Sequence, residues 1–166
     1  SCDDLCGSRF GPSLLGFVKG GSKCRYRTSS CCIDFPNVSR KFKRLIAEGK
    51  WEEASEIGRR QVRGGAQVVD VCVADPDRDE MADMLTFLPE IIRKVKAPLM
   101  LDSTDAAVLE VALTYSQGKA IINSVNLEDG EERFEKVLPL ARRFGAAVVC
   151  GTIDEDPQQG MAVTRA

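Results

Sequence analysis

The stretch PLMLDST (98–104) decides the fold, because its apolar run ends abruptly on the acid Asp102. Two other runs end in the same way: QVVD ends on Asp70, and AIINS ends on Asn123 and Ser124. A short continuous apolar run is typical of a strand that is buried on both faces. A carboxylate at the end of such a strand loses hydration free energy unless something binds it. These runs therefore predict several strands that share one polar edge.

Amphipathic segments separate the apolar runs and predict helices between the strands. The expected strands cover 67–73, 97–103, 118–124 and 146–154, and the expected helices cover 40–49, 51–65, 81–95, 105–116 and 131–145. Alternating strands and helices imply right-handed crossovers and a parallel sheet. Neither a G-x-G-x-x-G nor a Walker A pattern occurs, which disfavours the nucleotide-binding sheets. The predicted fold class is α/β, a partial (β/α)8 TIM barrel of about four consecutive β/α units.

Helix caps are predicted at two loops. The stretch DPDRDE (75–80) supplies a turn and an acidic N-cap for the helix that follows. Ser103 or Thr104 is expected to cap the helix that begins after PLMLDST.

The first 36 residues differ in texture from residues 37–166. They are rich in Gly, Ser and Cys without a sustained period, which predicts an irregular head of loops with at most one short strand at 13–18. Five of the seven cysteines lie in this head, but no C-x-x-C pair occurs and the chain has no His. We therefore predict no metal site and no disulfide framework. Cys72 and Cys150 lie inside apolar runs and are expected to be small, buried core residues.

Composition indicates a folded globular chain, with 43% hydrophobic and 29% charged residues among 166. The net charge of −2, with basic residues spread along the helices, gives no reason to expect nucleic acid. No apolar run approaches the roughly 18 residues that a membrane span needs, and no signal-peptide pattern is visible. We therefore expect a cytoplasmic protein with no membrane partner.

The polar residues at the strand ends define the candidate site. In a parallel α/β fold the carboxyl ends of the strands meet at one edge, where ligands bind. Asp70, Asp102, Asn123 and Asp154 each follow an apolar run. Carboxylates and an amide match a flat, nitrogen-rich ring with donors along one edge, such as a pterin or guanine.

Each of these residues also has an ordinary structural explanation. Asp102 and Ser103 fit a strand end followed by a helix cap, and Asn123 with Ser124 fits a turn. Asp154 lies in an acidic loop, where a solvated side chain is the commoner outcome. Only the convergence of several such residues on one edge favours a binding site.

Three segments, 64–84, 98–140 and 144–165, closely resemble the pterin-binding (methyltetrahydrofolate) domain of cobalamin-dependent methionine synthase. The likeness runs without visible gaps from about residue 40 to the end of the chain. The LDST and INS motifs are also shared with corrinoid-protein methyltransferases and, more distantly, with dihydropteroate synthases.

This resemblance implies a barrel that binds 5-methyltetrahydrofolate and donates its N5-methyl group to cob(I)alamin, in methionine synthesis from homocysteine. The cobalamin is carried by another domain of the full-length enzyme, and no cofactor is bound covalently here. The resemblance implies that Asp102 hydrogen-bonds the pterin edge and that Asn123, the expected catalytic residue, lies in the same pocket. It places Ser124 beside Asn123 and matches Asp70 to an acidic position of the family. Asp154 is added as a pterin-binding candidate from its position after the last apolar run alone.

The chain also departs from the family pattern. PNVSRKF (36–42) keeps only the tail of an expected G-E-R-T-N and G-S-R-K-F pattern, and Cys72 stands where many relatives have Asn. Later strand motifs of the family would fall beyond Ala166. We therefore expect residues 37–166 to be the N-terminal half of a truncated pterin-binding barrel, weakly active or inactive alone. The alternatives are a dihydropteroate synthase-like pterin enzyme and a non-catalytic truncated product that acts only as a binding or interaction piece.

Overall fold

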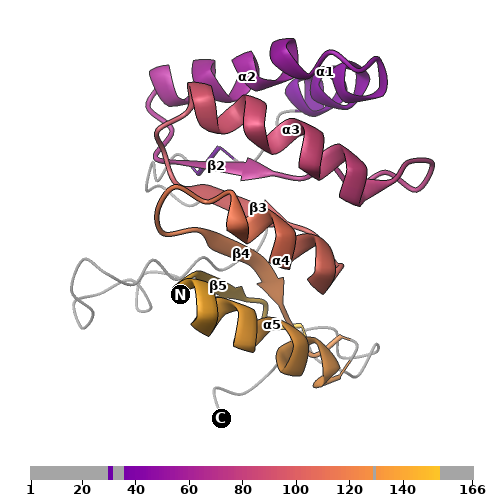
Figure 1. Ribbon diagram of the computed structural model, residues 1–166, viewed down its shortest axis with the longest axis vertical. Helices are drawn as coiled ribbons and strands as arrows, with labels where there is room; N and C mark the ends of the chain where they lie inside the picture. The colour runs from indigo at the N-terminus through magenta and orange to yellow at the C-terminus, as the bar shows by residue number, and fades with distance from the viewer. Residues whose placement is uncertain (1–29, 32–35, 129, 154–166) are drawn as a thin grey trace, which may run out of the picture.

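The computed structural model describes residues 30–31, 36–128 and 130–153, and its five strands form one parallel sheet (Figure 1). Each strand pairs with the next along the chain, in the order β1-β2-β3-β4-β5. The strands are β1 (Ser30–Cys31), β2 (Val68–Val71), β3 (Leu99–Asp102), β4 (Ile121–Val125) and β5 (Ala147–Cys150). The helices are α1 (Pro36–Ala47), α2 (Trp51–Arg63), α3 (Glu80–Lys94), α4 (Ala106–Thr114) and α5 (Glu132–Phe144).

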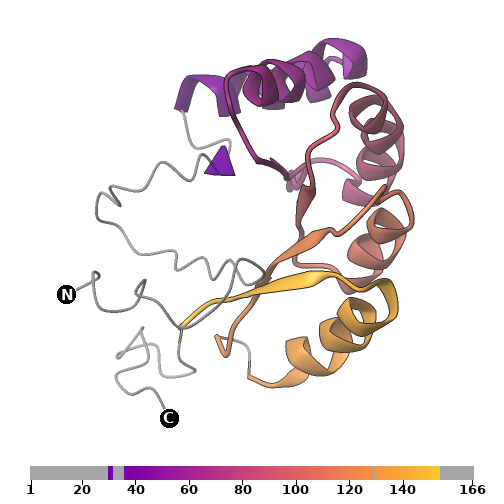
Figure 2. The same cartoon turned by 90° about the vertical axis from the view of Figure 1, so that its left-hand side faces the viewer.

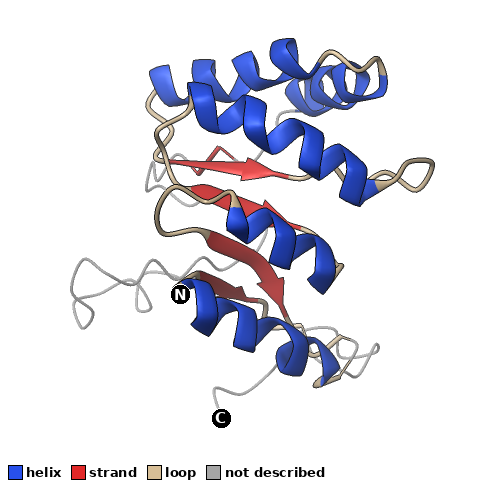
Figure 3. Cartoon of the chain, in the orientation of Figure 1, coloured by secondary structure: helices blue, strands red, loops and turns tan. Residues whose placement is uncertain are grey.

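The sheet is curved, and the helices cover its outer face (Figure 2). Strands and helices alternate along most of the described chain (Figure 3). Strands that pair in chain order, with a helix outside each crossover, form an arc of a (β/α)8 barrel. The predicted partial barrel is thus confirmed. No described helix is long and apolar enough to cross a membrane.

The hydrophobic core lies between the strands and the helices. In β2, Val69 and Val71 belong to it, and in β3 so do Leu99 and Leu101. Since successive side chains of a strand point to opposite faces, the residues between them point to the inside of the arc. The core also contains an edge-to-face aromatic pair, Phe42 of α1 and Phe87 of α3, with ring centroids 5.2 Å apart. Each of these strands thus packs against the helices through one face, while its other face carries the polar residues Asp70 and Asp102.

The helix caps confirm one prediction and correct another. Asp79 caps α3 and accepts a hydrogen bond from the Ala82 backbone at 3.0 Å, as the acidic DPDRDE loop predicted. The cap of α4 is Asp105, whose carboxylate accepts from the Ala107 backbone at 2.7 Å, so the prediction of Ser103 or Thr104 is wrong. Between the end of β3 at Asp102 and the start of α4 at Ala106, the chain makes an additional turn. The Ser103 hydroxyl makes that turn by accepting from the Asp105 backbone at 3.1 Å.

Two further expectations are corrected. Cys72 and Cys150 are exposed, not buried in the core. Cys72 lies between Val71 and Val73, which both belong to the core, so it faces the inner side of the arc, which the helices do not cover; Cys150 is the last residue of β5, where strand pairing ends. In the head, Ser30–Cys31 forms a short strand that pairs with β2, which sequence patterns did not predict. The strand expected at 13–18 lies outside the described residues.

Candidate functional site

Asp102 and Asn123 lie side by side at the carboxyl end of the sheet. They are register partners, Asp102 as the last residue of β3 and Asn123 within β4. Neighbouring strands are about 4.8 Å apart, so the two side chains stand within reach of one small ligand. The residues before them, Leu101 and Ile122, are fully buried in the core. Asp102 and Asn123 therefore point to the inside of the arc.

The other predicted residues take different positions. Asp70 pairs with Met100, two residues before Asp102, so it lies one layer deeper on the same side of the sheet, and it is buried. Ser124 follows Asn123 directly, through a cis peptide bond, at the point where the register between β4 and β5 shifts. Asp154 lies outside the described residues. The structure thus brings Asp102 and Asn123 together, with Asp70 below them and Ser124 beside them.

Cys72 adds a thiol to this end of the sheet. It follows Val71, the register partner of Leu101, and so continues toward the level of Asp102. Although much of the residue is exposed, the protein around the thiol raises its pKa, which a backbone hydrogen bond with Ala74 lowers in part. The negative charges of Asp102, Asp70 and Glu80 raise this pKa further. The Cys72 thiol thus stays protonated at neutral pH.

The loop between β2 and α3 is held by ion pairs. Arg78 donates two hydrogen bonds to the buried Asp83 carboxylate, at 2.6 and 2.7 Å. Asp75 accepts from the Asp77 backbone and pairs with Lys43 of α1 at 3.1 Å, and these two contacts lower the pKa of its carboxyl. These contacts hold the β2–α3 loop against α1 and α3, next to the carboxyl end of β2.

Arg133 is the residue that sequence reasoning missed. Its guanidinium donates to three backbone carbonyls: Ser124 O at 3.1 Å, Ser103 O at 2.7 Å, and Thr104 O. These carbonyls belong to the segments that directly follow Asp102 and Asn123. One signal could have indicated this role: Arg133 stands in the first turn of α5, the end of a helix that disfavours a positive charge.

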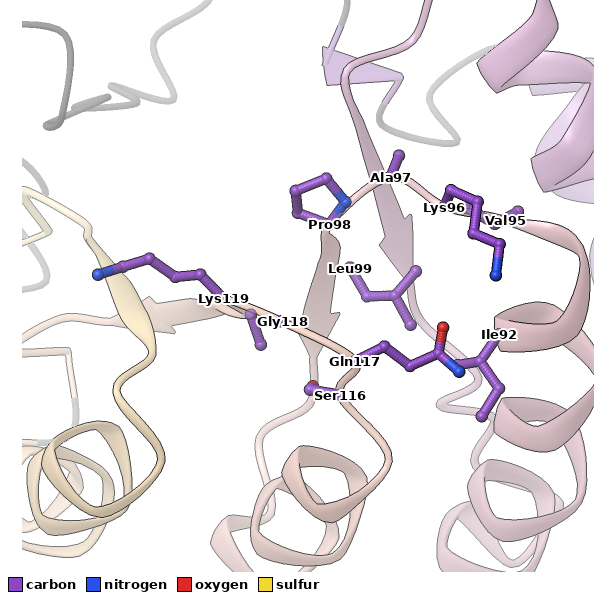
Figure 4. Close-up of a pocket in the computed structure, with 11 residues that line it drawn as sticks. Ile92, Val95, Lys96, Ala97, Pro98, Leu99, Ser116, Gln117, Gly118 and Lys119 are labelled. Atoms are coloured by element: carbon purple, nitrogen blue, oxygen red, sulfur yellow. The ribbon is translucent and has the colours of Figure 1, made fainter.

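The site lies away from the cavity shown in Figure 4. That cavity has a volume of about 330 Å³ and is lined by the segments that lead into β3 and β4, at the opposite end of the strands from Asp102. Its two lysines, Lys96 and Lys119, point in different directions (Figure 4). Within the described part of the chain, no group of three or more His, Cys, Asp or Glu residues is placed to hold a metal ion.

Comparison with known proteins identifies the family of the chain. Residues 37–165 match the family model of pterin binding enzymes. Because this match covers most of the chain, the chain belongs to the pterin binding enzyme family.

The individual relatives narrow the class. The chain is 40% identical over 125 residues to a methionine synthase of Mycobacterium tuberculosis (strain ATCC 25618 / H37Rv) and 39% identical over 125 residues to one of Mycobacterium leprae (strain TN). Each alignment covers 74% of this chain and 10% of the relative, so the chain spans about a tenth of the length of these relatives. The resemblance to the pterin-binding domain of methionine synthase is thus confirmed.

Proposed function

We propose that Asp102, Asn123 and Asp70 bind the pterin ring of 5-methyltetrahydrofolate, and that the bound folate donates its N5-methyl group to cob(I)alamin in methionine synthesis. The observation that carries this proposal is the register pair of Asp102 and Asn123 at the carboxyl end of a sheet from a pterin-binding family. The similarity to two methionine synthases supports methyl transfer over the synthesis of dihydropteroate.

The residue types suit the edge of a pterin. The ring carries N–H donors and carbonyl and ring-nitrogen acceptors along one side. The Asp102 carboxylate offers only acceptors, whereas the Asn123 amide offers both donors and an acceptor. Asp70, one layer deeper, provides a second carboxylate beneath this pair. We propose Ser124 and Asp154 as further pterin-binding residues.

The Asn123 amide also suits the chemistry of methyl transfer. When a methyl group leaves N5 of the folate, the electrons of the C–N bond stay on the nitrogen, and a tertiary amine is a poor leaving group. A proton or a strong hydrogen bond on N5 lowers this barrier. We propose that Asn123 holds N5 in its protonated form by hydrogen bonding. Cobalamin, carried on another domain, supplies the nucleophile, so the chain itself needs no serine or cysteine for this step.

We further propose that residues 37–166 form the N-terminal half of the pterin-binding barrel and that the sequence before them lies outside the family pattern. The cobalamin-binding domain of a full-length enzyme is then the expected protein partner. A protein of this function acts on soluble folates in the cytoplasm.

Titration calorimetry with 5-methyltetrahydrofolate tests the proposed function. Asp102→Ala should weaken binding by about 1–3 kcal/mol, since it removes charged acceptors from the ring edge. The matched control is Asp77→Ala, which removes an exposed carboxylate from the β2–α3 loop and should leave affinity unchanged. Asn123→Ala should lower the rate of methyl transfer to cob(I)alamin more than it lowers affinity. Equal affinity in wild type and Asp102→Ala would exclude Asp102 from the site.

A further inference from the structure

Arg133 stands at a position that helix stability does not explain. It is the second residue of α5, and the N-cap Glu131 makes no side-chain capping bond there. A positive charge in the first turn is opposed by the partial positive charge of the helix N-terminus. The stabilising interactions of this arginine must therefore come from outside its own helix.

Those interactions use all three nitrogen atoms of the guanidinium. Nε donates to Ser124 O, Nη2 to Ser103 O and Nη1 to Thr104 O. The acceptors lie 9, 30 and 29 residues away along the chain: Ser124 is in β4, and Ser103 and Thr104 are in the loop that follows β3. A planar arginine fork fixes the direction of each bond, whereas a lysine would act as a point charge on a flexible stem. Arg133 thus links the end of β3 to β4 in a defined geometry.

Arg133 connects β3 and β4 just beyond the last pair of residues that the sheet holds in register. Regular pairing of β3 and β4 ends at Asp102 and Asn123. Immediately after Asn123, the register of β4 against β5 shifts. Ser103 and Ser124, whose carbonyls accept from Arg133, are the next residues after Asp102 and Asn123. Arg133 therefore holds the two strand ends at the step where ladder hydrogen bonds no longer do so.

We propose that Arg133 is a positioning residue that sets the distance between the Asp102 carboxylate and the Asn123 amide, and thereby the affinity of the site for a pterin ring. This role rests on the proposed function, because the pterin is the ligand that needs both groups at once. Arg133 donates to backbone carbonyls and acts through its neighbours. Small displacements of positioned groups are sufficient to reduce function about 100-fold in other systems.

The experiment measures the affinity of the protein for 5-methyltetrahydrofolate in Arg133→Ala and Arg133→Lys. We expect a loss of about 10- to 100-fold in Arg133→Ala and a smaller loss in Arg133→Lys, which keeps the charge and most of the packing. The matched control is Arg143→Ala. Arg143 lies in the last turn of the same helix and pairs with Glu110 of α4 at 2.6 Å, so its removal also loosens α5 from α4 but does not touch the strand ends.

A double-mutant cycle separates positioning from a general structural role. In the Asp102→Ala background, Arg133→Ala should cost much less affinity than in wild type, because one of the groups that it positions is already gone. A merely structural arginine would weaken both backgrounds equally. Amide hydrogen exchange should also rise at 103–105 and 124–126 in Arg133→Ala and not in Arg143→Ala.

The outcomes distinguish this role from the proposed function. If the wild-type protein binds 5-methyltetrahydrofolate and both Arg133 variants bind it equally well, the positioning role is overturned and the pterin site stands. Additive losses in the double-mutant cycle overturn the positioning role in the same way. If the wild-type protein does not bind, the pterin assignment fails and the role of Arg133 fails with it. If Arg133→Ala does not fold, Arg133→Lys carries the test, with a measurable loss of affinity expected.

Discussion

Asp102 of β3 and Asn123 of β4 are register partners, so a carboxylate and an amide stand next to each other at the carboxyl end of the sheet. The pair combines a negative charge with a neutral group of nearly the same shape. Adjacent positions of this kind avoid the repulsion that two carboxylates would suffer. A substitution that makes both residues acidic should therefore lower the stability of the fold.

Asn123→Asp should lower the free energy of unfolding by about 1 kcal/mol at pH 7, because it places two like charges directly opposite each other. Repulsion raises the folded-state pKa of one carboxyl in the pair above the unfolded value of about 4. The penalty is present above that raised pKa and disappears as the pH falls through it. Urea unfolding at pH 7 and pH 5 should show the loss shrinking at the lower pH.

The control for this substitution is Asn126→Asp, three residues further along the chain and just beyond β4. Asn126 accepts a hydrogen bond from the Glu128 backbone through its side-chain oxygen, which an aspartate can replace. It adds the same charge without an opposing carboxylate in the sheet. An equal, pH-dependent loss in both variants would show that the effect does not come from the Asp102 pair.

Cys72 should be slow to react with iodoacetamide at pH 8, since the thiolate is the reactive form and its pKa is raised. The folded state thus holds the thiol proton more tightly than the unfolded chain. The stability that this provides is present below the unfolded pKa of about 8.5 and is lost as the pH rises through the folded value. Asp102→Asn removes one of the nearby negative charges, so alkylation of Cys72 should become faster.

Peptide mapping by mass spectrometry can follow this reaction at Cys72 and at Cys150 in the same sample. Cys150 is also exposed and serves as the internal reference. An unchanged ratio of the two rates in Asp102→Asn would mean that the Asp102 charge does not act on the thiol.

Gly58→Ala should destabilise the fold by about 1 kcal/mol. A methyl group at Gly58 of α2 would meet the Ile91 side chain of α3 at 2.6 Å, inside a packed core. Overpacking of this kind costs about 2 kcal/mol, and the better helix propensity of alanine offsets about 1 kcal/mol of it. Gly118→Ala is the control, because nothing lies within 4 Å of the added carbon. Denaturant unfolding should show a loss only at Gly58.

Asp105→Ala should lower the free energy of unfolding by about 1 kcal/mol, since it removes the side-chain cap of α4. Thr104→Ala should change it by less than about 0.5 kcal/mol, because its side chain makes no capping bond and its carbonyl still accepts from Arg133. Thermal melting of the two variants compares them directly. A larger loss in Thr104→Ala would restore the capping role that sequence reasoning first gave to this position.

Sequence patterns predicted the fold well where apolar periodicity is strong. The residues that precede Asp70 in β2 and Asp102 in β3 are buried on both faces of the sheet, and sequence shows this as continuous hydrophobicity; in β4, Ile122 is buried and Ile121 only partly so. The pairing of Asp102 with Asn123 follows from two parallel strands that end on polar residues. Periodicity says nothing, however, about positions beyond the last ladder pair.

That limit explains the errors. Cys72 looks buried in sequence because Val71 and Val73 flank it, yet these two residues face the core and Cys72 faces the inner side of the arc. The cap of α4 was misplaced by one or two residues because Ser103, Thr104 and Asp105 have similar capping preferences. Arg133 was missed because its partners are backbone carbonyls 9 to 30 residues away along the chain, and any residue type can supply a backbone acceptor.

Within the four residues of β3, some side chains pack in the core and others face the inside of the arc, so substitutions at the two kinds of position have different effects. Leu99 and Leu101 are held by the core, so almost any change there threatens folding. Asp102 stands outside that core, so under the proposed function a change there would alter ligand binding while the scaffold persists. Descendants of this chain could thus acquire new ligands through mutations at strand ends alone, without passing through unfolded intermediates in their evolution.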